Sequence, residues 1–117
     1  MRLVKLKSNG DFRRIYRRGK SFVTPFFVVY VLPNRKHRGI RLGITVGKKI
    51  GGAVQRNRAK RVITAAFRSC MPRICLGNDF VIVARTRILG IKSTVAAESL
   101  RKQLSAANVW CENETDQ

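Results

Sequence analysis

Acidic residues are absent from the middle of this chain. No aspartate or glutamate lies between Asp11 and Asp79, and the 117 residues together hold 25 Lys and Arg against 6 Asp and Glu, a net charge of +19. Any fold must leave most of these cations without a local partner, and so much like charge destabilises a compact domain unless something neutralises it. Polyphosphate backbones do this best, because each phosphate that pairs with Lys or Arg also releases condensed counterions. The charge therefore predicts a nucleic acid as the partner.

The length of the chain suits one compact domain, and 44% hydrophobic residues provide a core rather than a disordered basic tail. We expect one RNA-binding domain over residues 1–108 and an acidic, flexible tail over residues 109–117. An anionic membrane is the competing partner, but the longest apolar run, Phe26–Leu32, has seven residues, far short of the ~20 that span a bilayer. The N-terminus lacks the apolar stretch of a signal peptide, so we expect a cytoplasmic protein without membrane contact.

Hydrophobic periodicity and turn residues predict one mixed sheet with helices. The first helix begins at Ser8 or Asn9 and stops at a left-handed Gly19, and a last helix is capped by Ser93 or Thr94. The expected elements after the first helix are an extended piece at 21–24, strands at Phe26–Leu32 and Arg41–Val46 that form a hairpin, a helix at Ala53–Cys70, a strand at Asp79–Ala84 and a helix at about Val95–Ala107. The two strands that flank the central helix can run parallel.

The central helix separates its residues into two arcs when successive positions are turned by ~100°. The polar arc consists of Asn57, Lys60, Arg61, Thr64 and Arg68, with Arg56 and Arg58 at its borders, and the apolar arc of Ala59, Val62, Ile63 and Ala66. An ordinary amphipathic helix with a solvated face explains the apolar arc but not the charge, because like-charge (i, i+4) pairs such as Arg56–Lys60 are mildly destabilising. An RNA-binding face is the favoured interpretation.

The basic loop before this helix is less specific. Lys48 and Lys49 lie beside the expected helix N-terminus, where backbone amides can meet phosphate, but a flexible basic connector explains them equally well. The GxxxxGK[ST] spacing of a nucleotide-binding loop is absent.

A second candidate surface is aromatic. Phe12 and Tyr16 are four residues apart on the first helix, and Val28 and Tyr30 share one face of a strand. Together they would line a shallow apolar trough with cationic rims, which suits single-stranded nucleic acid, since each stacked base contributes ~1–3 kcal/mol. The alternative is that all four belong to the core, and it is strong for Phe12 and Val28.

Groups for protein-based catalysis are few. Hydrolysis of a phosphodiester needs a histidine pair or carboxylates that hold metals, whereas the chain has His37 alone and scattered acids. We therefore expect no catalytic residue and no metal site. The three cysteines are odd in number and lack CxxC spacing, which favours reduced intracellular thiols over a disulfide or a zinc site.

The segment from Leu42 to Arg61 (LGITVGKKIGGAVQRNRAKR) resembles the signature of the bacterial ribonuclease P protein component. The hallmark is an Arg-Asn-Arg core followed by Lys-Arg, after a strand that ends in a Lys-Lys loop. The resemblance covers about residues 3–104 and extends to Asp11-Phe12, Tyr16, Phe27–Tyr30 and Asp79–Arg85.

This resemblance implies a single-domain α/β sandwich of two layers, ribosomal-protein-like, in the order helix, three strands, helix, strand, helix, with a left-handed crossover into the last strand. It also implies a role in the ribonuclease P holoenzyme, an endonuclease whose catalytic RNA subunit uses Mg²⁺ to remove the 5′ leader of precursor tRNA. The protein would bind that RNA and hold the leader between first helix and sheet, with no catalysis of its own.

The resemblance assigns residues to both tasks. Those that would face RNA are Lys48, Lys49, Arg56, Asn57, Arg58, Lys60 and Arg61, with Arg68 substituting for the cation that many relatives have where this chain has Thr64. Those that would line the leader cleft are Phe12, Tyr16, Val28 and Tyr30. The rival interpretations are an RNA-binding protein of another assembly, such as a ribosomal protein or RNA chaperone, a protein-only ribonuclease and, least favoured, a membrane-active cationic protein.

Overall fold

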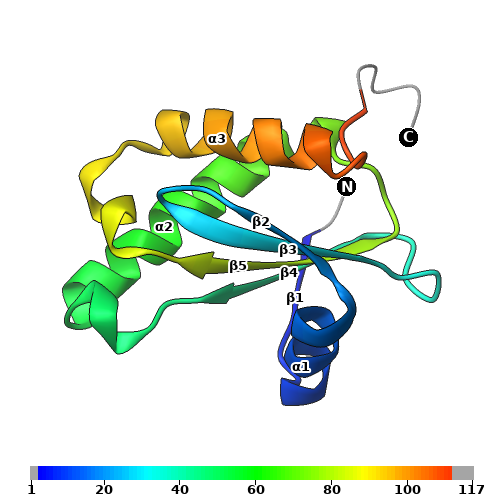
Figure 1. Ribbon diagram of the computed structural model, residues 1–117, viewed down its shortest axis with the longest axis horizontal. Coiled ribbons are helices and arrows are strands. Elements are labelled where there is room, and N and C mark those ends of the chain that lie inside the picture. The colour runs from blue at the N-terminus through cyan, green and yellow to red at the C-terminus, as the bar shows by residue number, and fades with distance from the viewer. Residues whose placement is uncertain (1–2, 112–117) are drawn as a thin grey trace.

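The computed structural model describes residues 3–111. Figure 1 shows their arrangement as one sheet with two helices on one side and a shorter helix on the other. In chain order the strands and helices are β1 (Leu3–Lys5), α1 (Asn9–Arg18), β2 (Lys20–Val23), β3 (Phe27–Pro33), β4 (Ile40–Thr45), α2 (Ala53–Cys70), β5 (Asn78–Ala84) and α3 (Ser93–Ala106). Short 3₁₀ turns at η1 (Lys48–Ile50), η2 (Met71–Arg73) and η3 (Thr86–Gly90) connect them.

The sheet has five strands in the order β1-β4-β5-β3-β2. β4 runs parallel to β5, so the predicted parallel pair around α2 is confirmed. The predicted hairpin of β3 and β4 is wrong, because β5 lies between them and pairs with both. β5 is the most completely buried strand, and its apolar side chains place it at the centre. The hairpin is formed instead by β2 and β3.

The element order predicted from the sequence lacked β1. This strand pairs with β4 in parallel, with Leu3 beside Ile40 and Lys5 beside Leu42. Three residues are too few to show a strand's alternating pattern, so β1 could not be predicted from periodicity. The single α/β domain is otherwise as expected, and the left-handedness of the α2 crossover stays a prediction.

One face of the sheet is closed by α2 and α3 (Figure 1). β3 buries Phe27, Val29 and Val31 on this side. The ring of Phe67 on α2 meets that of Phe80 on β5 edge-on, with 5.3 Å between their centroids. The main hydrophobic core therefore lies between the sheet and these two helices.

The opposite face is covered only in part, by α1. Ile15 of α1 packs there on Val81 and Leu6, and all three are buried. N-cap Ser8 accepts a hydrogen bond from the Gly10 amide, as predicted for this helix start. Gly19 at the other end is extended rather than left-handed. Glycine is required there for space, because a Cβ would lie 2.6 Å from the Ile15 carbonyl oxygen.

A charged cluster also attaches α1 to this face. The carboxylate of Asp79 is fully buried and accepts hydrogen bonds from Arg41 at 2.7 and 2.9 Å, from Arg14 at 2.9 Å and from Asn34 at 3.0 Å. Burial alone would raise the pKa of Asp79, but the hydrogen bonds of Arg41 and Asn34 and the nearby guanidinium charges outweigh it and lower that pKa below its ordinary value. Arg14 also pairs with Asp11.

The expectation that all three cysteines are reduced thiols is wrong. Cys75 and Cys111 are joined by a disulfide, and Cys70 is free and buried. A backbone bridge between Ile74 and Trp110 brings the two partners together across 36 residues, a proximity that linear spacing cannot reveal.

The end of the folded domain also differs from the prediction. Val109 and Cys111 are buried against the body, so the tail expected from residue 109 does not begin there, and residues 112–117 lie outside the described residues. The last helix starts at Ser93, with Lys92 as its cap, two residues before the predicted Val95.

Candidate nucleic-acid interface

Helix α2 presents its cations to solvent on one arc. The exposed cations are Arg58, Lys60, Arg61 and Arg68, Asn57 is exposed beside them, and Arg56 is half-buried. The other side of the helix is buried through Ala59, Ile63, Ala66 and Phe67. Within residues 3–111, no ion pair involves a cation of α2. The arc is therefore an uncompensated positive surface, as the sequence predicted.

The basic loop before α2 has a defined shape. Lys48 and Lys49 are exposed on η1, while Ile50 of the same turn is buried in the main core. Gly51 has a φ of +139°, which favours glycine. Gly52 caps α2 without a side-chain hydrogen bond, so no cap side chain satisfies the first amides of the helix. The loop is thus a turn that is anchored in the core and exposes two lysines, rather than a flexible connector.

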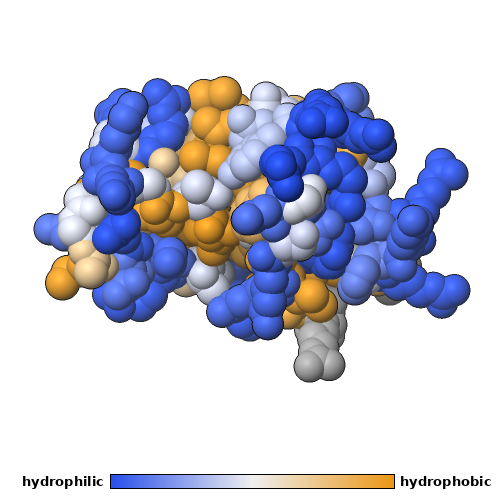
Figure 2. All heavy atoms as spheres, turned by 90° about the horizontal axis from the view of Figure 1, so that it is seen from below, coloured by the Kyte–Doolittle hydropathy of each residue, from blue (hydrophilic) through white to orange (hydrophobic). Residues whose placement is uncertain are grey.

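The four residues predicted to line a trough lie on one side of the molecule. The rings of Tyr16 and Tyr30 meet edge-on with centroids 5.0 Å apart, and Phe12 lies 6.4 Å from Tyr16. The Tyr16 hydroxyl shares a 2.8 Å hydrogen bond with the Thr45 hydroxyl at the end of β4. Val28 is half-buried beside Tyr30 on β3. Figure 2 shows an apolar band on this face, bordered by hydrophilic side chains on both sides.

Phe12 and Tyr16 differ within the trough. Tyr16 is 38% exposed, so its ring is accessible to a ligand. The Phe12 ring packs on the backbone of Gly43, where a Cβ would lie 2.5 Å from its Cζ. Phe12 is therefore mainly a contact between α1 and β4, in line with the core alternative.

Two trough residues were missed. Val23 is 62% exposed and pairs with Val28, which in turn pairs with Val83 on β5. Paired residues in neighbouring strands point to the same face, so these valines extend the apolar floor next to Tyr30. Their alternation was visible in the sequence, but the register that places them side by side depends on a strand order that the sequence did not reveal.

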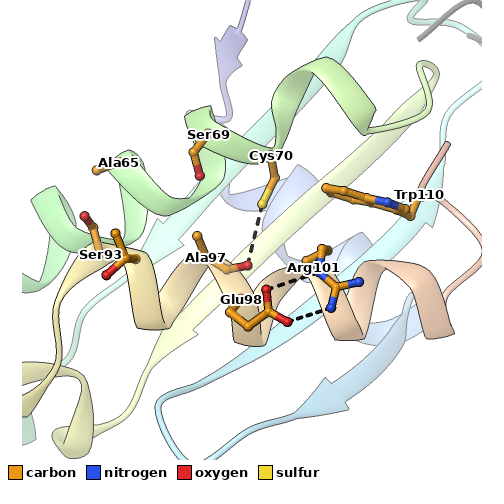
Figure 3. Close-up of a pocket in the computed structure, with 9 residues that line it drawn as sticks. Ala65, Ser69, Cys70, Ser93, Ala97, Glu98, Arg101 and Trp110 are labelled. Carbon is orange, nitrogen blue, oxygen red and sulfur yellow. Dashed lines mark hydrogen bonds and ion pairs between the residues drawn. The ribbon is translucent and has the colours of Figure 1, made fainter. Parts of the chain in front are cut away.

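A hollow of about 310 Å³ lies between α2 and α3 (Figure 3). Trp110 closes one end of it, and Glu98 pairs with Arg101 along its wall. The Cys70 Sγ lies 3.7 Å from the Ala97 carbonyl oxygen, and burial raises the pKa of that thiol. Because a carboxylate lines this hollow and the exposed cations of α2 do not, its electrostatics are poorly suited to RNA.

Other functional groups remain apart. His37 is exposed in the β3–β4 connection. Residues 3–111 contain no group of three or more His, Cys, Asp or Glu side chains that could hold a metal ion. None of the described helices combines the length and apolarity needed to span a bilayer.

Comparison with known proteins decides the family. Residues 1–108 match the family model described as Ribonuclease P. The chain belongs to the ribonuclease P protein family. It is 37% identical over 110 residues to the ribonuclease P protein component of Clostridium acetobutylicum, with 93% of this chain and 92% of that protein covered. It is 44% identical over 81 residues to the same component of Listeria innocua, covering 69% and 68%.

Solved structures of this family share the fold. The Staphylococcus aureus RNase P protein superposes with a TM-score of 0.80 at 38% identity, covering 91% of this chain and 96% of that one. The Thermotoga maritima protein gives 0.77 at 31% identity, covering 87% and 96%. Another S. aureus structure is of a mutant with defective mRNA degradation activity. Family membership connects this chain to ribonuclease P and to tRNA processing.

Proposed function

We propose that this chain is the protein subunit of ribonuclease P that binds the catalytic RNA subunit and the 5′ leader of precursor tRNA. The observation that supports this most directly is the adjacency of two surfaces. The tyrosine trough reaches the end of β4 through the Tyr16–Thr45 hydrogen bond, and the chain runs from Thr45 within three residues into Lys48 and then into α2. One RNA-binding surface thus adjoins the other.

The α2 arc suits a structured RNA. Its exposed cations have no acidic partner among the described residues, so phosphates can pair with them without breaking existing ion pairs. Each such contact releases counterions and makes affinity salt-dependent. We assign Lys48, Lys49, Arg56, Asn57, Arg58, Lys60, Arg61 and Arg68 to this contact.

The trough suits a single strand. Tyr16 and Tyr30 offer aromatic surface, Val28 lies beside them, and Arg13 and Arg17 are exposed on α1, the wall of the trough. Single-stranded nucleic acid binds where aromatic platforms adjoin basic rims. A duplex would expose only its edges and backbone, so an unpaired leader is the better occupant.

The chemistry is assigned to the RNA subunit with Mg²⁺, and the protein contributes binding. The body carboxylates of Asp11 and Asp79 already pair with arginines, which leaves them poorly suited as metal ligands. We therefore propose that the Mg²⁺ required for cleavage is held on the RNA side.

The test is 5′ processing of a precursor tRNA at low Mg²⁺, with the protein alone, the RNA subunit alone, and both together. We expect cleavage that is far faster with both components than with either one. No stimulation by the protein would indicate an RNA-binding protein of another assembly.

A second candidate is mRNA degradation, the activity named for the S. aureus relative. The same experiment tests it if a single-stranded mRNA fragment is incubated with the protein alone. Degradation that persists through further purification of the protein would mean that the chain carries catalytic groups of its own.

A further inference from the structure

A second hollow, of about 290 Å³, opens between α2 and the outer edge of β4. On the helix side it is lined by Lys60, Thr64 and Arg68, which are spaced four residues apart and so form one row along α2. The middle member of the row is short and uncharged, so a gap remains between the two cations. The hollow shares Phe12 with the trough and Lys60, Thr64 and Arg68 with the α2 arc, but its strand side, at Leu42–Ile44, belongs to neither.

The strand side of the hollow is an unpaired sheet edge. β1 accompanies β4 only as far as Leu42, whose carbonyl oxygen accepts a 3.0 Å hydrogen bond from the Leu6 amide. Backbone groups alternate in direction along a strand, so the N–H and C=O of Ile44 point to this same outer edge. Among residues 3–111, neither group forms a backbone hydrogen bond with a segment on that outer side. The hollow therefore offers one backbone donor and one acceptor side by side.

The remaining walls combine apolar surface with positive charge. Lys5 adds a third cation, and no carboxylate lines the hollow. This distinguishes it from the hollow between α2 and α3, which contains Glu98. The apolar lining consists of Leu3, Leu6, Phe12, Leu42 and Ile44.

We propose that this hollow binds one unpaired nucleotide of RNA. The base lies against the apolar wall, where its edge pairs with the N–H and C=O of Ile44, and the phosphate lies between Lys60 and Arg68. The proposal rests on the proposed RNA-binding function and adds a separate subsite to it. The nucleotide comes either from the RNA subunit or from the precursor tRNA.

Size and edge length favour a nucleotide over an acidic peptide. The volume is at the small end of the range for ligand sites, roughly 300–1,000 Å³, which suits one planar group. A peptide that adds a strand needs a run of free edge, whereas β4 continues for only three residues after Leu42.

The decisive variant is Thr64→Leu, which narrows the gap, keeps every cation and favours the helix. We expect it to weaken RNA binding about tenfold, the loss typical of one stacked base. The slope of log affinity against log salt should flatten by at most about one unit, the share of the one phosphate held between Lys60 and Arg68. Thr94→Leu, a matched change at an exposed position of α3, should bind as the wild type does.

Two arms distinguish the sources of the nucleotide. The affinity of Thr64→Leu for the isolated RNA subunit is measured first, and the affinity of its holoenzyme for precursor and for mature tRNA second. A loss in the first arm assigns the nucleotide to the RNA subunit, and a loss confined to leader-bearing precursor assigns it to the leader. Wild-type affinity in both arms overturns the subsite. Failure of the wild-type protein itself to bind RNA would instead overturn the proposed function.

A measurement on the unmodified protein makes the conclusion independent of the variant's folding. RNA containing 4-thiouridine is crosslinked to the wild-type chain, and we expect crosslinks in the peptides that carry Leu3–Leu6 or Leu42–Ile44. Their absence overturns the proposal. So does a glutamate-rich peptide that occupies this edge and leaves RNA binding unaffected, since the hollow would then be a peptide site.

Discussion

The two faces of the sheet differ in how they are covered. On the α2–α3 face, large side chains such as Phe27, Phe67 and Phe80 are almost completely buried. On the α1 face, Ile15 and Val81 form a small buried cluster, while Tyr16 and Val23 remain exposed. Charged groups around Asp79 complete the attachment of α1.

This difference suggests a division of work. Burial of apolar area is the main stabilising contribution in folding. The α2–α3 face, here the closed face, supplies most of it, and the α1 face is the open face. The open face can therefore leave aromatic and aliphatic side chains in solvent, where a single strand can reach them. Helix α2 takes part in both folding and binding, because one arc of it enters the core and the other carries the cations.

The largest expected effect is on the closed face. Phe80→Ala removes a fully buried ring that contacts Phe67, and we expect a loss of about 3–5 kcal/mol in the free energy of unfolding. Urea denaturation followed by circular dichroism measures it. Val23→Ala, on the open face, is the comparison variant and should cost less than about 0.5 kcal/mol. Similar losses for the two variants would contradict the division of work.

The next effect concerns the attachment of α1. Asp79→Asn keeps the shape of the side chain but removes the buried charge from Arg14 and Arg41. We expect a loss of about 2–3 kcal/mol at pH 7, somewhat below the 3–5 kcal/mol of a fully buried pair, because Arg14 is partly exposed.

The pH dependence of this loss has a definite sign. The pKa of Asp79 is lower in the folded protein than its ordinary value, so its stabilisation is fully present above the unfolded pKa of about 4. It disappears as the pH falls through the folded pKa. Wild type and Asp79→Asn should therefore differ in urea denaturation at pH 7 and converge in strongly acidic solution. A constant difference would mean that the carboxylate charge is not the cause.

The sequence predicted the closed face better than the open one. The bounds of α2 were predicted correctly, because its start and end have local signals in the Gly51–Gly52 pair and in Pro72. The buried β5 strand was likewise evident from its apolar run. Both rest on local patterning, which a single sequence carries directly.

Contacts between distant segments could not be predicted in the same way. The position of β5 between β3 and β4, the pairing of β1, and the Cys75–Cys111 bond all depend on which segments meet in space. The residues of the trough were named from helix and strand periodicity. Val23 was missed because its position beside Val28 depends on the register between β2 and β3. What local periodicity determines was predictable, and what strand order determines was not.

A smaller effect is expected in the trough. Tyr30→Ala removes one wall of the Tyr16–Tyr30 contact, and we expect the holoenzyme to lose about tenfold in affinity for leader-bearing precursor, the effect of one stacked base. Affinity for mature tRNA should hardly change. Tyr30→Phe, which keeps the ring, is the matched control and should retain most of the binding. Equal losses on both RNAs would remove Tyr30 from the leader cleft.

The smallest single effect is expected on the α2 arc, where many cations share the contact. Arg58→Ala should weaken binding of the RNA subunit severalfold and flatten the plot of log affinity against log salt by up to about one unit, the share of one phosphate contact. Arg56→Ala, at the other border of the arc, should act in the same direction. Lys102→Ala removes an equal charge from an exposed position on α3 and should change the slope less. If neither arginine variant alters the slope, the cations of α2 do not pair with phosphate, and the open face alone must account for RNA binding.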